Sequence, residues 1–101
     1  MYRFDAELWL YPGDAPWHFL TVPNEISDEI RIWTSDGRRA FGSVRAKAMI
    51  GRTSWSTSLF PDAGGQTYLL PVKKSVRIKE ELVEGDRVTV EVEILDSARG
   101  L

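Results

Sequence analysis

The sequence has no cysteine and a single histidine, His18. The chain therefore forms no disulfide, offers no thiol nucleophile or cysteine-ligated zinc site, and could activate a serine nucleophile with histidine only through His18. Long apolar runs are also absent, and residues 1–7 alternate apolar and charged side chains, so we expect neither a membrane span nor a signal peptide. Together with the lack of cysteine, this predicts a cytoplasmic protein with no membrane partner.

The 101 residues suffice for one compact domain, which we predict over residues 1–101. Apolar residues make up 43% and charged residues 28%, close to the average for globular proteins. A domain of this size buries roughly two thirds of the surface that its unfolded chain exposes. The four Trp, four Phe and three Tyr can therefore contribute to a small core.

The net charge of −2 hides a strong segregation along the chain. Residues 38–79 carry nine basic groups and one acid, whereas residues 1–37 and 80–101 each carry two basic groups and seven acids. The basic middle could form a surface that attracts an anionic partner. Alternatively, Arg45 and Lys47 would face Glu7, Glu91 or Glu93 across the sheet, and the charges would neutralise one another within the fold.

Alternating apolar and polar residues predict six strands, at residues 2–11, 17–22, 41–50, 53–60, 66–70 and 87–95. In the first strand, Tyr2, Phe4, Ala6, Leu8 and Leu10 share the inner face. Turn-forming residues separate the strands at Pro12–Pro16, Asp36-Gly37, Gly51-Arg52 and Pro61–Gly65.

Two short amphipathic helices are predicted between these strands. One begins near Asn24 and turns Ile26, Ile30 and Trp33 inward, and the other runs from Val72 to a break at Glu84. Turns too short for parallel crossovers predict a mainly β fold, a small closed or partly open antiparallel β-barrel of about six strands with two short helices. Val22-Pro23 and Leu70-Pro71 each open a helix, an echo that suggests a pseudo-two-fold, double-split-barrel-like arrangement.

A set of motifs resembles a known family over nearly the whole chain. In order, the motifs are Trp17-His18-Phe19, Thr57–Pro61, Gly64-Gly65, Tyr68–Arg77 and Glu84–Val88. They resemble the uncharacterised bacterial family called domain of unknown function nineteen-oh-five, which implies a small β-barrel and no assigned activity. A weaker similarity, to swapped-hairpin DNA-binding regulators and antitoxins that build one barrel from two half-length chains, is an analogy of fold alone.

Our first functional hypothesis is a non-enzymatic binding module for an anionic partner, either nucleic acid or an acidic protein surface. Trp55 or Tyr68 would offer a stacking surface for a base. The candidate ligand-binding residues are Arg45, Lys47, Arg52, Lys73, Lys74 and Arg77. The alternative is an ordinary solvated helix face, in which Glu80 and Glu81 offset the neighbouring cations.

A second hypothesis is a small-molecule binder or enzyme with a pocket at the barrel mouth near Gly64-Gly65. His18, Ser58 or Tyr68 would supply hydrogen bonds there. The double glycine lacks the Lys-Ser/Thr that follows it in phosphate-binding loops. We predict no catalytic residue, metal site or cofactor, and a third hypothesis is an accessory domain with an exposed apolar patch.

Overall fold

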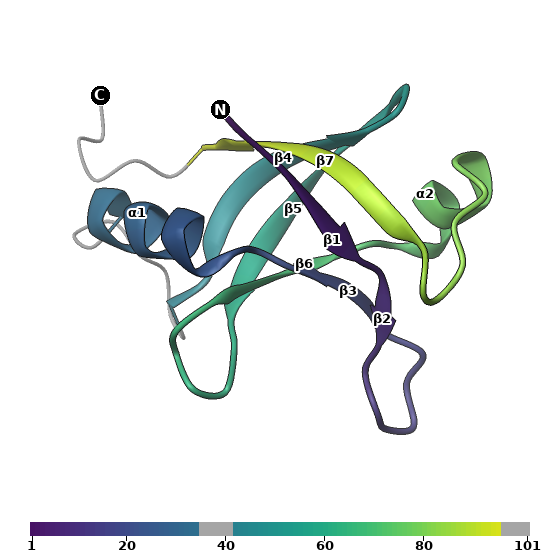
Figure 1. The fold of residues 1–101 in the computed structure, drawn as a ribbon, viewed down its shortest axis with the longest axis horizontal. Coiled ribbons are helices and arrows are strands. Elements are labelled where there is room, and N and C mark those ends of the chain that lie inside the picture. The colour runs from purple at the N-terminus through teal and green to yellow at the C-terminus, as the bar shows by residue number, and fades with distance from the viewer. Residues whose placement is uncertain (35–41, 96–101) are drawn as a thin grey trace.

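The computed structural model describes residues 1–34 and 42–95, in which two helices and seven strands are found. They are β1 (Tyr2–Glu7), β2 (Trp9–Leu10), β3 (His18–Thr21), α1 (Asn24–Thr34), β4 (Val44–Ile50), β5 (Thr53–Pro61), β6 (Tyr68–Pro71), α2 (Lys74–Lys79) and β7 (Arg87–Ile94). Paired strands are antiparallel and follow the order β1-β7-β4-β5-β6-β3-β2 (Figure 1). The predicted mainly β, antiparallel barrel with two helices is confirmed.

The barrel nearly closes because the first predicted strand bends at Leu8. Residues before it pair with β7, whereas Trp9 and Leu10 pair with β3 at the other end of the strand order. Leu8 itself is fully buried, and its backbone exchanges hydrogen bonds with Gly85 and Asp86 at 2.8 Å. The single strand predicted over residues 2–11 is therefore two strands, which accounts for seven strands where six were expected.

Alternation along the strands places the core inside the barrel. Phe4, Ala6 and Leu8 are buried as predicted, and the inward side chains of β4 and β7 alternate with exposed ones over nearly their whole length. Leu10 was expected inside but is exposed, because it lies beyond the bend at the end of the two-residue strand β2. The predicted turn at Asp36-Gly37 and the predicted strand start at Phe41 lie outside the described residues.

Helix α1 begins at Asn24, as predicted, but presents a different inner face. Ile30 is buried and Ile26 partly buried, whereas Trp33 is 44% exposed, contrary to prediction. Ser27 and Thr34 take the remaining inner positions. Each of these hydroxyls donates to a backbone carbonyl, Ser27 to Val22 and Thr34 to Ile30, so both polar groups are satisfied where they are buried.

Helix α2 is shorter than predicted, because it ends at Lys79 instead of continuing toward Glu84. Glu81 adopts a left-handed conformation with φ 55°, which an α-helix cannot continue through. The backbone N–H groups of Glu81 and Leu82 donate to the carbonyls of Ile78 and Arg77, the bonding pattern of a Schellman cap. Glycine is the usual residue at this position. Because glutamate occupies it here, the sequence did not predict that the helix ends there.

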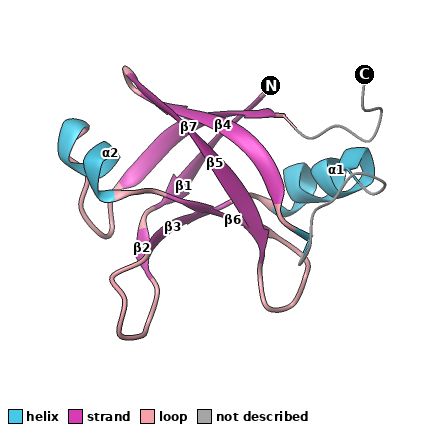
Figure 2. Cartoon of the chain, turned by 180° about the vertical axis from the view of Figure 1, so that it is seen from behind, coloured by secondary structure: helices cyan, strands magenta, loops and turns pink. Residues whose placement is uncertain are grey.

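The strand pairing has the predicted pseudo-two-fold pattern. Leu20 of β3 pairs with Leu70 of β6, and residues fifty positions apart make equivalent bonds: the N–H of Val22 donates to Tyr68 and that of Val72 to His18, both at 2.9 Å. Figures 1 and 2 show α1 and α2 at opposite ends of the barrel. The sequence comparison of the two halves matched Pro23 with Pro71. This alignment is wrong, because the offset of fifty residues makes Lys73 the equivalent of Pro23.

Candidate anion-binding site

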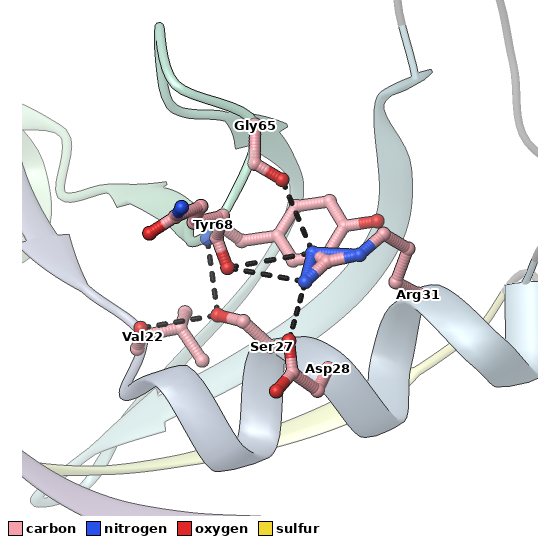
Figure 3. A network of polar contacts seen from close by, with 7 residues as sticks. Val22, Ser27, Asp28, Arg31, Gly65 and Tyr68 are labelled. Atoms are coloured by element: carbon pink, nitrogen blue, oxygen red, sulfur yellow. Dashed lines mark hydrogen bonds and ion pairs between the residues drawn. The ribbon is translucent and has the colours of Figure 1, made fainter.

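At the α1 end of the barrel, polar contacts fasten the helix to the strands. The Ser27 hydroxyl donates to the carbonyl of Val22 and accepts from the N–H of Tyr68, both at 3.1 Å, so one buried side chain bridges two backbone groups (Figure 3). Arg31 donates to the carbonyls of Gly65 and Gln66 and forms an ion pair with Asp28. The loop between β5 and β6 is thus held against α1.

At the α2 end, an open pocket of about 340 Å³ lies beside the helix. Arg77 stands where α1 has Ser27, and its Nε donates to the carbonyl of Val72 at 3.1 Å, as Ser27 does to Val22. The position that corresponds to Arg31 is Glu81, which lies beyond the end of α2. The pocket is lined by Ala15, Pro16, Trp17, His18, Pro71, Val72, Lys73, Lys74 and Arg77.

A second pocket of about 410 Å³ adjoins the first and extends over β5. Trp17, Pro71 and Lys73 line both pockets, and we call the combined surface the Lys73 groove. The second pocket is lined by Trp17, Arg45, Trp55, Ser56, Thr57, Ser58, Phe60, Pro71 and Lys73. Four cationic side chains thus line the groove, and its described lining residues include no aspartate or glutamate.

Trp17 forms an exposed aromatic platform at the junction of the two pockets. Its side chain is 54% exposed and stacks on Phe19, with ring centroids 6.1 Å apart and an interplanar angle of 7°. Phe19 in turn packs on Trp9, whose indole nitrogen donates to the Thr21 hydroxyl at 2.9 Å. Tyr11 packs on both Trp9 and Phe19, so Trp17 stands at the end of a cluster of four aromatic rings.

The aromatic residues named from sequence as stacking surfaces are mostly enclosed. Tyr68 is 2% exposed and belongs to the core, so the expectation that it stacks on a base is wrong. Trp55 lines the second pocket but is largely buried. Sequence inspection passed over Trp17 and Phe60 as stacking candidates, although alternation places both rings on the outer faces of their predicted strands, opposite the buried Leu20 and Leu59.

The structure brings Arg45, Lys73, Lys74 and Arg77 to the groove but places Lys47 elsewhere. Lys47 lies opposite Glu93 of β7 and shares another pocket with Glu91 and Glu93, as the neutralised arrangement predicts. The two alternatives for the basic middle of the chain therefore hold for different residues. Lys47 faces acids across the sheet, whereas the cations beside α2 face none among the described lining residues of the groove.

Arg52 also lies away from the lining residues of the groove, in the turn between β4 and β5. Its backbone N–H donates to the Glu80 carboxylate at 3.3 Å, and the Thr53 hydroxyl donates to the same oxygen at 2.6 Å. A side chain at Gly51, where φ is +58°, would collide with this carboxylate. Glu80 therefore secures a turn, and among the described residues it forms no ion pair with a cation of α2.

The residues of the second hypothesis do not converge near Gly64-Gly65. The Gly65 carbonyl faces Arg31 of α1, whereas His18 lines the pocket beside α2. His18 Nδ1 lies 3.1 Å from the Pro16 carbonyl, which can only accept, so the two form a hydrogen bond in the tautomer that has the proton on Nδ1. Ser58 lines the second pocket, and in the described part of the chain no group of three His, Asp or Glu could hold a metal ion.

These features define a small antiparallel β-barrel with a cationic, aromatic-lined groove at one of two pseudo-symmetric ends. A model of the family described as Domain of unknown function (DUF1905) matches residues 4–92, so the chain belongs to this family, as the motifs had suggested. No curated protein matches the chain. Neither helix of the described residues is long and apolar enough to cross a membrane.

Proposed function

We propose that this protein is a binding module that holds an anionic partner, nucleic acid or an acidic protein surface, in the Lys73 groove. The observation that carries the proposal is the gathering of Lys73, Lys74 and Arg77 around one concave surface, which Arg45 also lines and whose described lining residues include no carboxylate. Neighbouring cations repel one another, and a low-dielectric concave wall strengthens the field that they produce. An anion bound there relieves this repulsion.

The arrangement favours binding over catalysis. A serine nucleophile needs a base within hydrogen-bond reach, and Ser58 and His18 line different pockets of the groove. Arg77, by contrast, is positioned for recognition, because its Nε is anchored on Val72 while its side chain lines the pocket.

The test is a titration, followed by anisotropy, against labelled single-stranded DNA, single-stranded RNA, duplex DNA and a polyglutamate peptide. We expect at least one probe to bind at low salt. If four cations contact phosphates, affinity for a single strand falls about 50-fold between about 50 mM and 200 mM salt. Failure of every probe to bind at low salt would overturn the proposal.

Variants inside and outside the groove locate the binding site. Alanine at Lys73, Lys74 and Arg77 together should weaken binding at least about tenfold and flatten the salt dependence. Lys47→Ala removes the same kind of charge from a position opposite Glu93 and should change affinity less than about twofold. If the groove variant loses the same binding free energy per removed charge as Lys47→Ala does, the attraction is nonspecific and no defined binding site exists.

A further inference from the structure

We infer that the ligand of the Lys73 groove is single-stranded nucleic acid, with a base stacked on Trp17 and phosphates on the cations around it. This inference rests on the proposed function and names the partner more narrowly. Its first observation is the exposure of Trp17, more than half of whose surface faces solvent at the place where the two pockets meet. A large flat apolar side chain held at that position is suited to a flat ligand group.

The second observation is that the Trp17 ring packs against a cluster of other aromatic rings. It lies nearly parallel to Phe19, which packs on Trp9, and the Trp9 indole is tied to Thr21. A supported platform loses little conformational freedom when a base stacks on it, so more of the stacking energy contributes to affinity.

The third observation is that flat rings and cations line the same groove. Lys73 and Trp17 line both pockets, Lys74 and Arg77 line the first, and Arg45 lines the second. Phe60, 44% exposed, offers a second ring in the pocket over β5. A single strand presents both unpaired bases and phosphates, and aromatic platforms within basic grooves are the usual means of binding it.

The competing ligands use only part of this surface. In a duplex, bases stack on one another and present no face to Trp17 or Phe60. An acidic protein surface would pair with the cations but bring no aromatic heterocycle to the rings. Hydroxyl groups of Ser56, Thr57 and Ser58 line the same pocket and suit the polar edges of an unpaired base or its sugar.

The decisive experiment compares oligothymidylate of about ten nucleotides with an abasic chain that carries the same number of phosphates. Both engage the cations, but only the first can stack. We expect the wild-type protein to bind oligothymidylate at least about tenfold more tightly than the abasic chain. Oligouridylate of the same length, measured in parallel, shows whether DNA or RNA is preferred.

Variants separate stacking from charge. Trp17→Ala should weaken oligothymidylate binding at least about fivefold and leave abasic binding unchanged, whereas Trp17→Phe should retain most of the difference between the two probes. Trp33→Ala is the matched control, because Trp33 is an exposed tryptophan of α1, at the opposite end of the barrel (Figure 1), and lines neither pocket. Circular dichroism of each variant verifies that the barrel is folded.

The failures of the two proposals are distinguishable. Equal affinity for oligothymidylate and the abasic chain, or tighter binding of duplex or polyglutamate than of any single strand, overturns the stacking inference and leaves the anion-binding function standing. Unchanged oligothymidylate binding by Trp17→Ala also overturns it. If no anionic probe binds the wild-type protein at low salt, both proposals fall together.

Discussion

The two ends of this barrel have equivalent backbone hydrogen bonds but differ in the side chains that join the helix to the strands. At one end Ser27 is fully buried in the 11-residue helix α1 and binds two backbone groups; at the other, Arg77 makes the equivalent single bond from the six-residue helix α2. Arg31 closes the first end onto Gly65 and Gln66. The second helix stops before the corresponding position, and a cationic groove lies there instead.

This contrast shows how a symmetric scaffold can acquire one site. A buried serine suits a closed end, because its small hydroxyl is satisfied within the fold. An arginine at the equivalent position buries its stem and keeps its charged head near solvent. The closed end contributes stability, and the open end has the features of a ligand site.

The largest loss of stability is expected in the core that the two ends share, and it should be similar for the two halves of the chain. Leu20→Ala and Leu70→Ala each remove a fully buried side chain from the paired strands at the pseudo-two-fold centre, and each should lower the free energy of unfolding by about 2–5 kcal/mol. Urea denaturation measures both losses. A difference above about 2 kcal/mol between them would show that the two halves are not energetically equivalent.

The next effect should separate the two ends. Ser27→Ala leaves the buried N–H of Tyr68 without its partner and should cost about 1–3 kcal/mol of stability, whereas Arg77→Ala should cost less than about 1 kcal/mol, because Arg77 is only partly buried. Binding of anionic probes should show the reverse order, with Arg77→Ala the more damaging. Similar stability losses in the two variants would contradict the distinction between a closed and an open end.

A smaller effect concerns the early end of α2. Glu81→Gly places glycine at the left-handed C-cap position and should raise the free energy of unfolding by about 0.5–1 kcal/mol. Glu84→Gly is the control, since Glu84 is also exposed but has no positive φ, and should not stabilise the protein. Thermal unfolding compares the two variants, and equal shifts would argue against strain at Glu81.

The smallest effect is a pH dependence at the closed end. Burial raises the pKa of Tyr2 above its ordinary value of 10.0, and the hydrogen bond to Glu29 and the charge of Glu29 raise it further. The neutral hydroxyl is the form that donates to Glu29, so its contribution is present below about pH 10 and lost as the pH rises through the folded-state pKa. The stability difference between wild type and Tyr2→Phe should therefore stay constant up to about pH 10 and shrink above it, and a difference that grows there would refute this.

Sequence patterns predicted the barrel better than they predicted the groove. Alternation located the strands, since it depends on which face of a single strand is buried. The bend at Leu8 and the early stop at Glu81 escaped notice, because each depends on bonds to other segments or on a residue type unusual for its conformation. Of the six predicted ligand residues, Arg45, Lys73, Lys74 and Arg77 line the groove, and Lys47 and Arg52 do not.

By itself, the sequence determined the antiparallel β class, the two helix positions and the concentration of positive charge in residues 38–79. These properties follow from local periodicity and composition, which neighbouring residues carry on their own. Only the tertiary structure decided which cations share one surface, that Trp17 rather than Tyr68 presents its ring there, and that Glu80 serves a turn. Such relations join segments far apart in the chain, and strand pairing alone brings them together.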